Sequence, residues 1–371
     1  MPRQVRIELG PGFHLERGVI EGDLPAEDGV QRISWHARRV ATVQNVAGSL
    51  YGLAYGDALG KPTEFMEYEA IVARYGPGGP VQLSGTPALV TDDTQMALAV
   101  GEALLAAPAI TPGELEPLLR QAFLDWAVSP DNNRAPGMTC LRACAGLSDG
   151  LPWVEATQAG SKGCGANMRV TPVGLMPGLS DEQRAGAAQL QAALTHGHPT
   201  GLAASELTAY ACNWLLGGLA PGEIVGALRD RCRRQRRVYR GEWLGELWRR
   251  SEARSPEEFI AVGWDECLVA LDRVDVALAA GAFGGDPCLA TGAGWIAEEA
   301  LATALYCYLI SPTEPVAVLG RGAASSGDSD SIACLAGAFA GAALGNAAWP
   351  SGWPDQIEYT DRLARVAAAW E

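Results

Sequence analysis

The sequence lacks long apolar runs and paired cysteines, and it has too few basic residues to balance its acidic ones. Residues 332–344 are too short and too rich in glycine and alanine to span a bilayer, and residues 1–8 lack the apolar core of a signal peptide. The nine cysteines are an odd number and include no CxxC pair or spacing typical of a disulfide framework. These absences predict a cytoplasmic protein with free thiols and no membrane segment.

Negative charge dominates the chain. Lys and Arg number 28 against 43 Asp and Glu, a formal net charge of −15. Such a chain repels nucleic-acid phosphates, so we expect no nucleic-acid binding. The arginine-rich run at 229–240 is the exception. It is typical of a solvated helix face paired with acidic neighbours, and docking of an acidic partner protein is the alternative.

Strand-like alternation is nearly absent, whereas apolar residues recur every three or four positions along most of the chain. This spacing predicts an all-α fold, and tryptophans at such positions, for example Trp214 and Trp295, are expected in the core. Residues 1–38 lack the periodicity and are predicted to be an N-terminal extension, either a disordered tail or an arm that packs on the domain or on a partner. Residues 39–371 are predicted to form one domain. The expected helices cover 40–60, 94–107, 113–128, 137–149, 183–195, 201–217, 221–232, 256–281, 294–310, 313–323 and 331–345.

Small residues mark one face of the first expected helix. They stand at 48, 52, 56 and 60, a four-residue spacing that places them on one side of a helix. Another element is therefore expected to approach that face closely. Gly60 and Pro62 end the helix and leave Glu64 on a loop beside Phe65.

Two short clusters, residues 91–94 (Thr-Asp-Asp-Thr) and residues 328–331 (Asp-Ser-Asp-Ser), each combine carboxylates and hydroxyls at the start of an expected helix. Such oxygens, without a neighbouring Cys or His pair, suit Mg²⁺ or Mn²⁺ rather than zinc. Helix capping is the simpler explanation, but it accounts for one carboxylate per helix and not two. The two clusters together therefore predict one metal site.

Five separated blocks in this order resemble the ADP-ribosylglycohydrolase family. They are residues 56–65 (Gly-Asp-Ala-Leu-Gly-Lys-Pro-Thr-Glu-Phe), 91–94, 163–169 (Gly-Cys-Gly-Ala-Asn-Met-Arg), 195–197 (Thr-His-Gly) and 327–331 (Gly-Asp-Ser-Asp-Ser). The resemblance implies a compact many-helix domain with a central binuclear metal cleft that holds two Mg²⁺ or Mn²⁺ ions. A threonine is common in the family where Ser331 stands, but a serine hydroxyl can serve the same role. The implied metal ligands are Thr91, Asp92, Asp93, Asp328, Asp330 and Ser331.

The resemblance also implies catalytic and substrate-binding residues. Glu64 is the first candidate for the general acid/base, with Asp92 and Asp330 as catalytic ligands; a solvated loop carboxylate is the alternative for Glu64. The glycines of the 163–169 loop would let backbone N–H groups approach a pyrophosphate, although the pattern alone is typical of a tight turn. Residues 134–139 match a further family block, with helix initiation as their expected role and substrate contact as the alternative. The implied substrate contacts are Gly163, Gly165, Asn167, Met168, Arg169, His196 and Gly327, of which His196 alone would more simply be a structural histidine.

The expected activity is metal-dependent removal of ADP-ribose from a modified protein side chain, with arginine as the first candidate. One alternative is an immunity-type protein that binds and neutralises an ADP-ribosyltransferase through residues 1–38, with or without hydrolysis. Another keeps the site but uses an ADP-ribose-capped small molecule or a free nucleotide-sugar. The sequence does not identify the aromatic residue that would stack on adenine.

Overall fold

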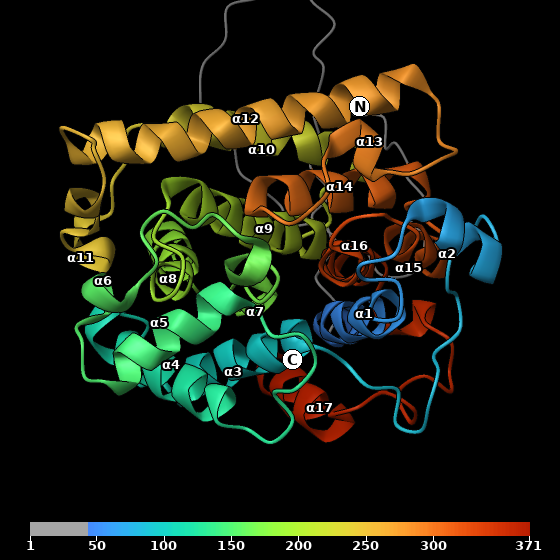
Figure 1. Cartoon of the computed structure of the whole chain (residues 1–371), viewed down its shortest axis with the longest axis horizontal. Helices are drawn as coiled ribbons and strands as arrows, with labels where there is room; N and C mark the ends of the chain where they lie inside the picture. The colour runs from blue at the N-terminus through green and yellow to red at the C-terminus, as the bar shows by residue number, and fades with distance from the viewer. Residues whose placement is uncertain (1–43) are drawn as a thin grey trace, which may run out of the picture.

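The structure is a computed structural model that describes residues 44–371, and its regular elements are helices (Figure 1). Only isolated β-bridges, and no β-strands, occur in this range. The first helices are α1 (Gln44–Gly60), α2 (Tyr68–Tyr75), α3 (Asp92–Ala106), α4 (Pro112–Ala127), α5 (Met138–Ser148), α6 (Trp153–Ala156), α7 (Thr171–Leu175), α8 (Asp181–Ala193) and α9 (Pro199–Leu216). They are followed by α10 (Ile224–Gln235), α11 (Gly241–Leu244), α12 (Pro256–Ala280), α13 (Cys288–Thr291), α14 (Ala297–Ile310), α15 (Pro315–Ala323), α16 (Ser329–Leu344) and α17 (Thr360–Trp370). The short 3₁₀ helices are η1 (Cys164–Ala166), η2 (Pro221–Glu223), η3 (Leu247–Arg250) and η4 (Asn346–Ala348).

The all-α prediction is confirmed for the described residues. Each expected apolar segment contains a helix, the first of them from Gln44 onward. The predicted extension, residues 1–38, lies outside the described residues. Among the helices of eight residues or more, the sequence analysis omitted α2 and α17. In α2 only Ile71 is buried, so this helix carries almost no apolar pattern.

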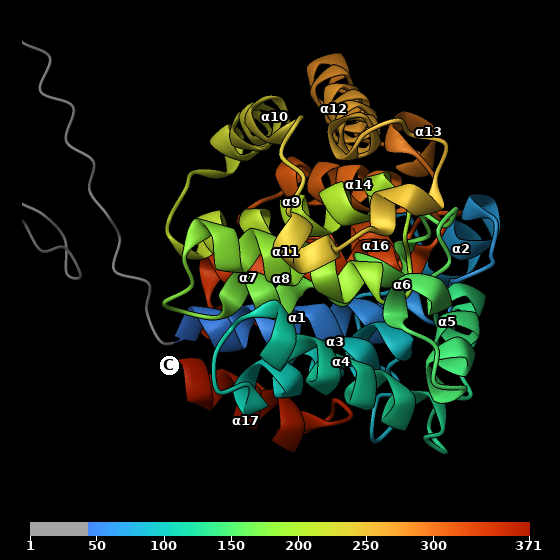
Figure 2. The same ribbon diagram turned by 90° about the vertical axis from the view of Figure 1, so that its left-hand side faces the viewer.

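Helices α1 and α16 form the most intimate helix pair of the described fold, and both views show them side by side at the centre (Figures 1 and 2). A Cβ on Gly52 would lie 2.3 Å from the carbonyl oxygen of Gly337, and a Cβ on Gly56 would lie 2.0 Å from that of Ala333. Backbone touches backbone along this contact. The close approach predicted from the small-residue face is therefore confirmed, and α16 is the element that makes it.

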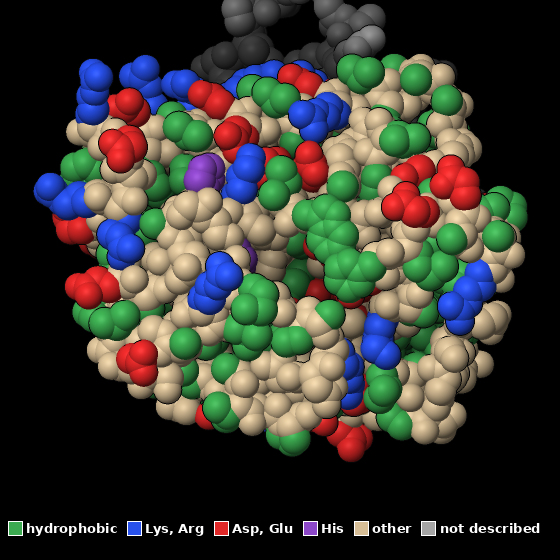
Figure 3. Space-filling view, in the orientation of Figure 1, with side chains coloured by type: hydrophobic (Ala, Val, Ile, Leu, Met, Phe, Trp, Pro, Cys, Tyr) green, Lys and Arg blue, Asp and Glu red, His purple; other side chains and the backbone are tan. Residues whose placement is uncertain are grey.

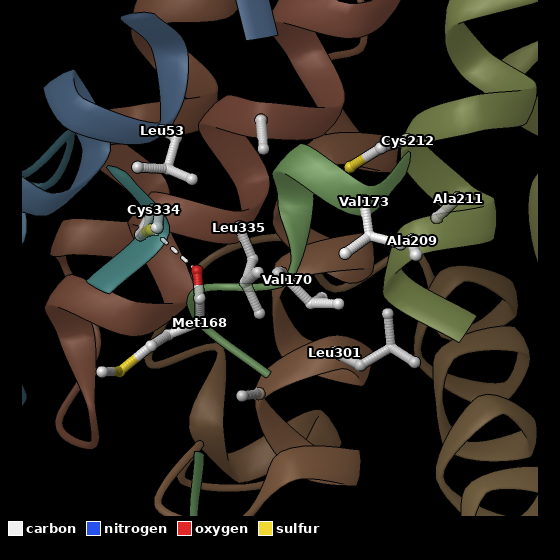
Figure 4. Packing of buried hydrophobic residues seen from close by; sticks show 14 of the residues in the cluster. Leu53, Met168, Val170, Val173, Ala209, Ala211, Cys212, Leu301, Cys334 and Leu335 are labelled. Atoms are coloured by element: carbon white, nitrogen blue, oxygen red, sulfur yellow. Dashed lines mark hydrogen bonds between the residues drawn. The ribbon is translucent and has the colours of Figure 1, made fainter. Parts of the chain in front are cut away.

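The core beside this pair joins α1, α7, α9, α14 and α16. Figure 4 shows side chains from these helices meeting around residues 168–173, with Leu53 on one side and Leu301 on another. The Cys334 thiol on α16 donates to the Met168 carbonyl oxygen at 3.7 Å (Figure 4). Loop 163–169 is thereby held against the same helix that carries the second acidic cluster.

The arginine-rich run belongs largely to α10 and lies next to α12. Arg231 and Arg240 are buried and bind Glu206 at 2.6 and 3.3 Å. Arg229 bridges Asp272 and Asp275 on α12 at 2.8 and 2.5 Å. These three arginines are therefore paired with acidic residues of the same chain.

All nine cysteines are free thiols, as predicted. Within residues 44–371, no helix combines the length and apolarity needed to cross a membrane.

Candidate functional site

The first turn of α3 is held by a carboxylate from α1. Asp57 is fully buried, and its oxygens accept hydrogen bonds from the backbone N–H of Thr91 at 2.9 and 3.0 Å and from that of Thr94 at 3.0 Å. The Thr94 hydroxyl donates to it at 2.5 Å. A negative charge is favourable at this end of a helix because its N–H groups have no partners within the helix. Asp57 thus fixes the residues on either side of Asp92 and Asp93.

The first turn of α16 lies against the end of α1. A Cβ on Gly60 would be 2.4 Å from the Cα of Asp330, so only glycine allows this approach. The Ser329 hydroxyl donates to the Gly60 carbonyl oxygen at 3.1 Å and lies 3.0 Å from the Thr63 hydroxyl oxygen. Asp328 occupies the N-cap position without making a side-chain cap. Helix capping therefore does not account for the carboxylate of Asp328.

The two clusters meet at one cavity of about 340 Å³, although they are distant in the sequence. Figure 3 shows acidic side chains set below hydrophobic ones near the centre of this face. The Thr91 side chain opposes the rise in the pKa of Asp330, so the two clusters interact directly with one another. The cavity is lined by Asp92, Asp93, Asp328, Asp330 and Ser331 from the clusters and by Glu64 from the turn after α1.

Burial and mutual repulsion disfavour ionisation of this group. Burial, followed by the charge of Asp330, raises the pKa of Glu64 to about 9 and that of Asp57 to about 7. Burial also raises the pKa of Asp92 to about 7, against a hydrogen bond from the Gly137 N–H. In the described structure, none of these carboxylates forms a salt bridge with Lys, Arg or His. Burial and neighbouring carboxylates also raise the pKa values of Asp93 and Asp328. Burial raises the pKa of Asp330 as well, although its interaction with Asp328 opposes the rise.

The residues fit a divalent cation by their chemistry. Asp93 has a buried carboxylate oxygen, Oδ2, with no hydrogen-bond partner, and the surrounding donors are hard oxygens. A cation would neutralise the repulsion described above. As they stand, however, no three Asp, Glu, His or Cys side chains within residues 44–371 form a group that could hold a metal ion. The side chains would have to close in to bind one, and the binuclear centre stays a prediction.

The predicted substrate contacts divide into two groups. Gly163, Gly165, Met168 and His196 line the cavity. A Cβ on Gly165 would lie 3.0 Å from the Cε1 of His196, so this glycine lets the loop pack on the imidazole.

The other three lie behind the cavity wall. The Asn167 amide donates to the Ala297 carbonyl oxygen at 3.1 Å, and the Arg169 guanidinium is fully buried among internal partners. A Cβ on Gly327 would be 1.8 Å from the Ala293 carbonyl oxygen, so this glycine serves backbone packing. Any effect of these three on substrate binding would be indirect.

Loop 134–139 forms another wall, which the sequence analysis assigned mainly to helix initiation. The Gly137 N–H donates to Asp92 Oδ2 at 3.1 Å. Arg134 does not line the cavity but binds Glu358 at 2.5 and 2.9 Å and the Val90 carbonyl oxygen at 2.5 Å. It therefore clamps the segment just before the first acidic cluster.

Two aromatic side chains stand at the cavity. Phe65 and Trp295 stack with ring centroids 5.5 Å apart, and they are 68% and 43% exposed. The expectation that Trp295 is a core residue is wrong, because it precedes α14 on a loop instead of lying on the buried face of that helix. Phe65 has a φ of 66°, a conformation that is uncommon for a non-glycine residue.

Asp57 was not among the predicted site residues. It stands in the same 56–65 block as Glu64 and lies between two glycines of the small-residue face. The sequence did contain a signal for Asp57, because it places a carboxylate on a helix face that is expected to pack closely.

Comparisons with known proteins identify the family. Residues 38–371 match the model of the ADP-ribosylglycohydrolase family. The uncharacterised protein YegU of Escherichia coli is 28% identical over 81% of this chain and 88% of its own. The ADP-ribosyl-[dinitrogen reductase] glycohydrolase of Rhodospirillum rubrum is 25% identical over 84% of this chain and 89% of its own. The ADP-ribosylarginine hydrolase Tri1 of Serratia proteamaculans is 28% identical, but the match covers only 48% of this chain and 49% of that protein.

A solved structure, an ADP-ribosylglycohydrolase-related protein complex, has the same fold. Its TM-score is 0.60 at 23% identity, over 88% of this chain and 97% of the solved one. The family match extends over nearly the whole chain and includes every acidic residue of the cavity. The chain therefore belongs to the ADP-ribosylglycohydrolase family.

Proposed function

We propose that this protein is a divalent-metal-dependent hydrolase that removes ADP-ribose from a modified protein side chain, with arginine as the first candidate linkage. The observation that carries the proposal is the convergence of carboxylates from α3, α16 and the turn after α1 on one cavity. Family membership supports ADP-ribosyl hydrolysis in general. The metal dependence and the linkage are the parts that experiment must test.

The proposed metal ligands are the residues named from the sequence. When bound, Mg²⁺ or Mn²⁺ would hold ribose hydroxyls and polarise a water molecule. The proposed ligands are Thr91, Asp92, Asp93, Asp328, Asp330 and Ser331.

Glu64 is proposed as the general acid/base. Glu64 lines the cavity together with Asp330, whose charge raises the pKa of the Glu64 carboxyl, so it can reach a group bound beside the acidic clusters. Cleavage at the anomeric carbon of ribose develops oxocarbenium-like charge, and proton donation to the leaving group assists departure. Glu64 would donate that proton and accept one from the attacking water.

The arginine linkage is supported by relatives and by the cavity mouth. The S. proteamaculans relative is named as an ADP-ribosylarginine hydrolase, and the R. rubrum relative as acting on a dinitrogen reductase. The exposed outer faces of Phe65 and Trp295 offer flat surfaces for a planar group, either adenine or a guanidinium. Hydrolysis of an ADP-ribose-capped small molecule or a nucleotide-sugar remains the alternative to a protein substrate.

A substrate panel tests the proposal. Proteins or peptides ADP-ribosylated on arginine or on serine, and a small ADP-ribose conjugate, are incubated with the enzyme in Mg²⁺, Mn²⁺ or EDTA. We expect release of free ADP-ribose with either ion, fastest from arginine, and none in EDTA. Equal rates with and without EDTA would exclude metal dependence, and release only from the small conjugate would exclude a protein substrate.

The variant Glu64→Gln is expected to lower kcat by about 10²-fold or more, the usual scale for losing a positioned acid/base. The amide keeps the shape of the side chain but cannot exchange a proton, so folding and Mg²⁺ binding should change little. Release of ADP-ribose measures the rate. Glu67→Gln, an exposed carboxylate at the start of α2 that makes no side-chain cap, is the matched control. Wild-type turnover in Glu64→Gln would assign the proton transfer to another group.

The immunity-type alternative assigns residues 1–38 to an ADP-ribosyltransferase partner, and these residues lie outside the described range. Deleting residues 1–38 is expected to preserve hydrolysis of a small ADP-ribosylated substrate, because all proposed metal ligands lie after Val90. The same deletion should abolish binding of a protein partner, measured by isothermal titration. If the deletion abolished hydrolysis and partner binding equally, residues 1–38 would be part of the catalytic fold. The proposed domain boundary at residue 39 would then be wrong.

A further inference from the structure

Arg169 is a fully buried cation bound by neutral partners. Its Nε donates to the Gln191 side-chain oxygen at 2.7 Å, and one terminal nitrogen donates to the Gln191 carbonyl oxygen at 2.6 Å. Its guanidinium carbon lies 4.2 Å from the centre of the Phe123 ring. Within residues 44–371, no carboxylate pairs with it. Burying a guanidinium without a carboxylate is unfavourable, so packing alone does not account for Arg169.

The partners of Arg169 lead to His196. The terminal nitrogen that binds the Gln191 carbonyl also donates to the Thr195 hydroxyl oxygen at 2.8 Å. That hydroxyl lies 2.8 Å from Nδ1 of His196 and 3.5 Å from the Ala192 carbonyl oxygen. The chain of contacts therefore runs from the guanidinium through the hydroxyl to the imidazole.

Counting protons assigns the tautomer of the imidazole. A guanidinium can only donate, so Thr195 accepts from Arg169 and has one proton of its own to give. Nδ1 of His196 is the closer acceptor, by 2.8 Å against 3.5 Å. With Nδ1 accepting, the ring proton of a neutral imidazole must be on Nε2.

The ring is neutral and belongs to a residue that lines the cavity. Burial, followed by the charge of Arg169, lowers the pKa of His196 to about 3. His196 lines the cavity, and a Cβ on Gly163 would lie 3.3 Å from Nε2. Among the residues that the structure describes, Nε2 has no hydrogen-bond partner. Its hydrogen-bonding capacity is therefore unused within the described protein.

We propose that Arg169 and Thr195 are positioning residues that fix His196 as a neutral imidazole with its proton on Nε2, so that this N–H donates to an acceptor oxygen of the bound ligand. The identity of that ligand, ADP-ribose with its hydroxyl and phosphate oxygens, rests on the function proposed above. The tautomer does not, because it follows from hydrogen bonds within the protein. Neither positioning residue touches the ligand itself.

The experiment compares Thr195→Val with Thr195→Ser in the full chain. Valine keeps the shape of threonine but cannot relay a hydrogen bond, whereas serine keeps the hydroxyl. The protein has four histidines, so its imidazoles are labelled with ¹⁵N and His196 is assigned from the signal lost in His196→Gln. Circular dichroism checks that each variant folds, and titration calorimetry with ADP-ribose measures affinity.

We expect an unprotonated Nδ1 and a protonated Nε2 in the wild type and in Thr195→Ser. Thr195→Val should show averaged tautomers and about tenfold weaker ADP-ribose binding, the effect of misplacing one hydrogen-bond donor. Protonated Nδ1 in the wild type, or an unchanged tautomer and affinity in Thr195→Val, would overturn the proposal. If the wild type shows the expected tautomer but does not bind ADP-ribose, the proposed ligand is wrong and the positioning role is supported.

Discussion

Replacing Gly56 by alanine is expected to destabilise the protein by about 4 kcal/mol or more, or to prevent folding. The added Cβ would lie 2.0 Å from the carbonyl oxygen of Ala333 and 2.3 Å from its carbonyl carbon. Both atoms belong to the backbone of α16, so no side-chain rotation can relieve the overlap. The two helices must move apart, which would open the core and displace Asp57 from the first turn of α3.

Gly226→Ala is the matched control. Gly226 also lies within a helix, α10, but a Cβ there would meet no atom within 4 Å. Alanine at such a position is expected to stabilise by about 0.5–1 kcal/mol because it restricts the unfolded chain. Urea unfolding followed by circular dichroism measures both changes. Similar stabilities for the two variants would mean that the α1–α16 contact adjusts easily.

Asp330→Ala is expected to lower activity by about 10³-fold and to weaken Mg²⁺ binding at the same time, because several kcal/mol of charge stabilisation depend on the metal. Asp330 is the carboxylate whose charge acts on most of the others in the cavity. Removing it also relieves repulsion among the remaining carboxylates. The variant should therefore be at least as stable as the wild type in EDTA.

Melting temperatures with and without Mg²⁺ separate these effects. Because an ion that binds only the folded state raises Tm, the wild type should gain stability on adding Mg²⁺ and Asp330→Ala should gain much less. Asp125→Ala, which changes an exposed carboxylate bound to Gln121 on α4, should behave like the wild type. A full Mg²⁺-dependent rise in Tm for Asp330→Ala would remove this residue from the ligand set.

The helices could be predicted because most of them bury an apolar stripe whose spacing is visible in the sequence. In α17 the buried residues Leu363, Val366, Ala367 and Trp370 follow the same spacing. That signal was present but not used. Helix α2 could not be found in this way, because it buries a single apolar residue.

The meeting of the two acidic clusters could also be predicted, since each cluster places more carboxylates at the start of a helix than helix capping requires. The roles of Arg169 and Trp295 could not. An arginine in a loop gives no sign that it will be fully buried, and a tryptophan at helical spacing can stand just before the helix begins. These outcomes depend on how distant elements pack, which local spacing does not encode.

The pairing of α1 with α16 has a consequence for synthesis of the protein. The Gly60 carbonyl oxygen accepts one of its hydrogen bonds from Ser329, 269 residues further along the chain. At roughly 5–20 residues per second, the ribosome needs on the order of tens of seconds to complete that stretch. Throughout this time the glycine face of α1 has no partner and Asp92 and Asp93 lie without the second cluster. A nascent chain therefore cannot assemble the cavity until almost the whole polypeptide has emerged, and any truncation before α16 removes the central helix contact together with half of the acidic site.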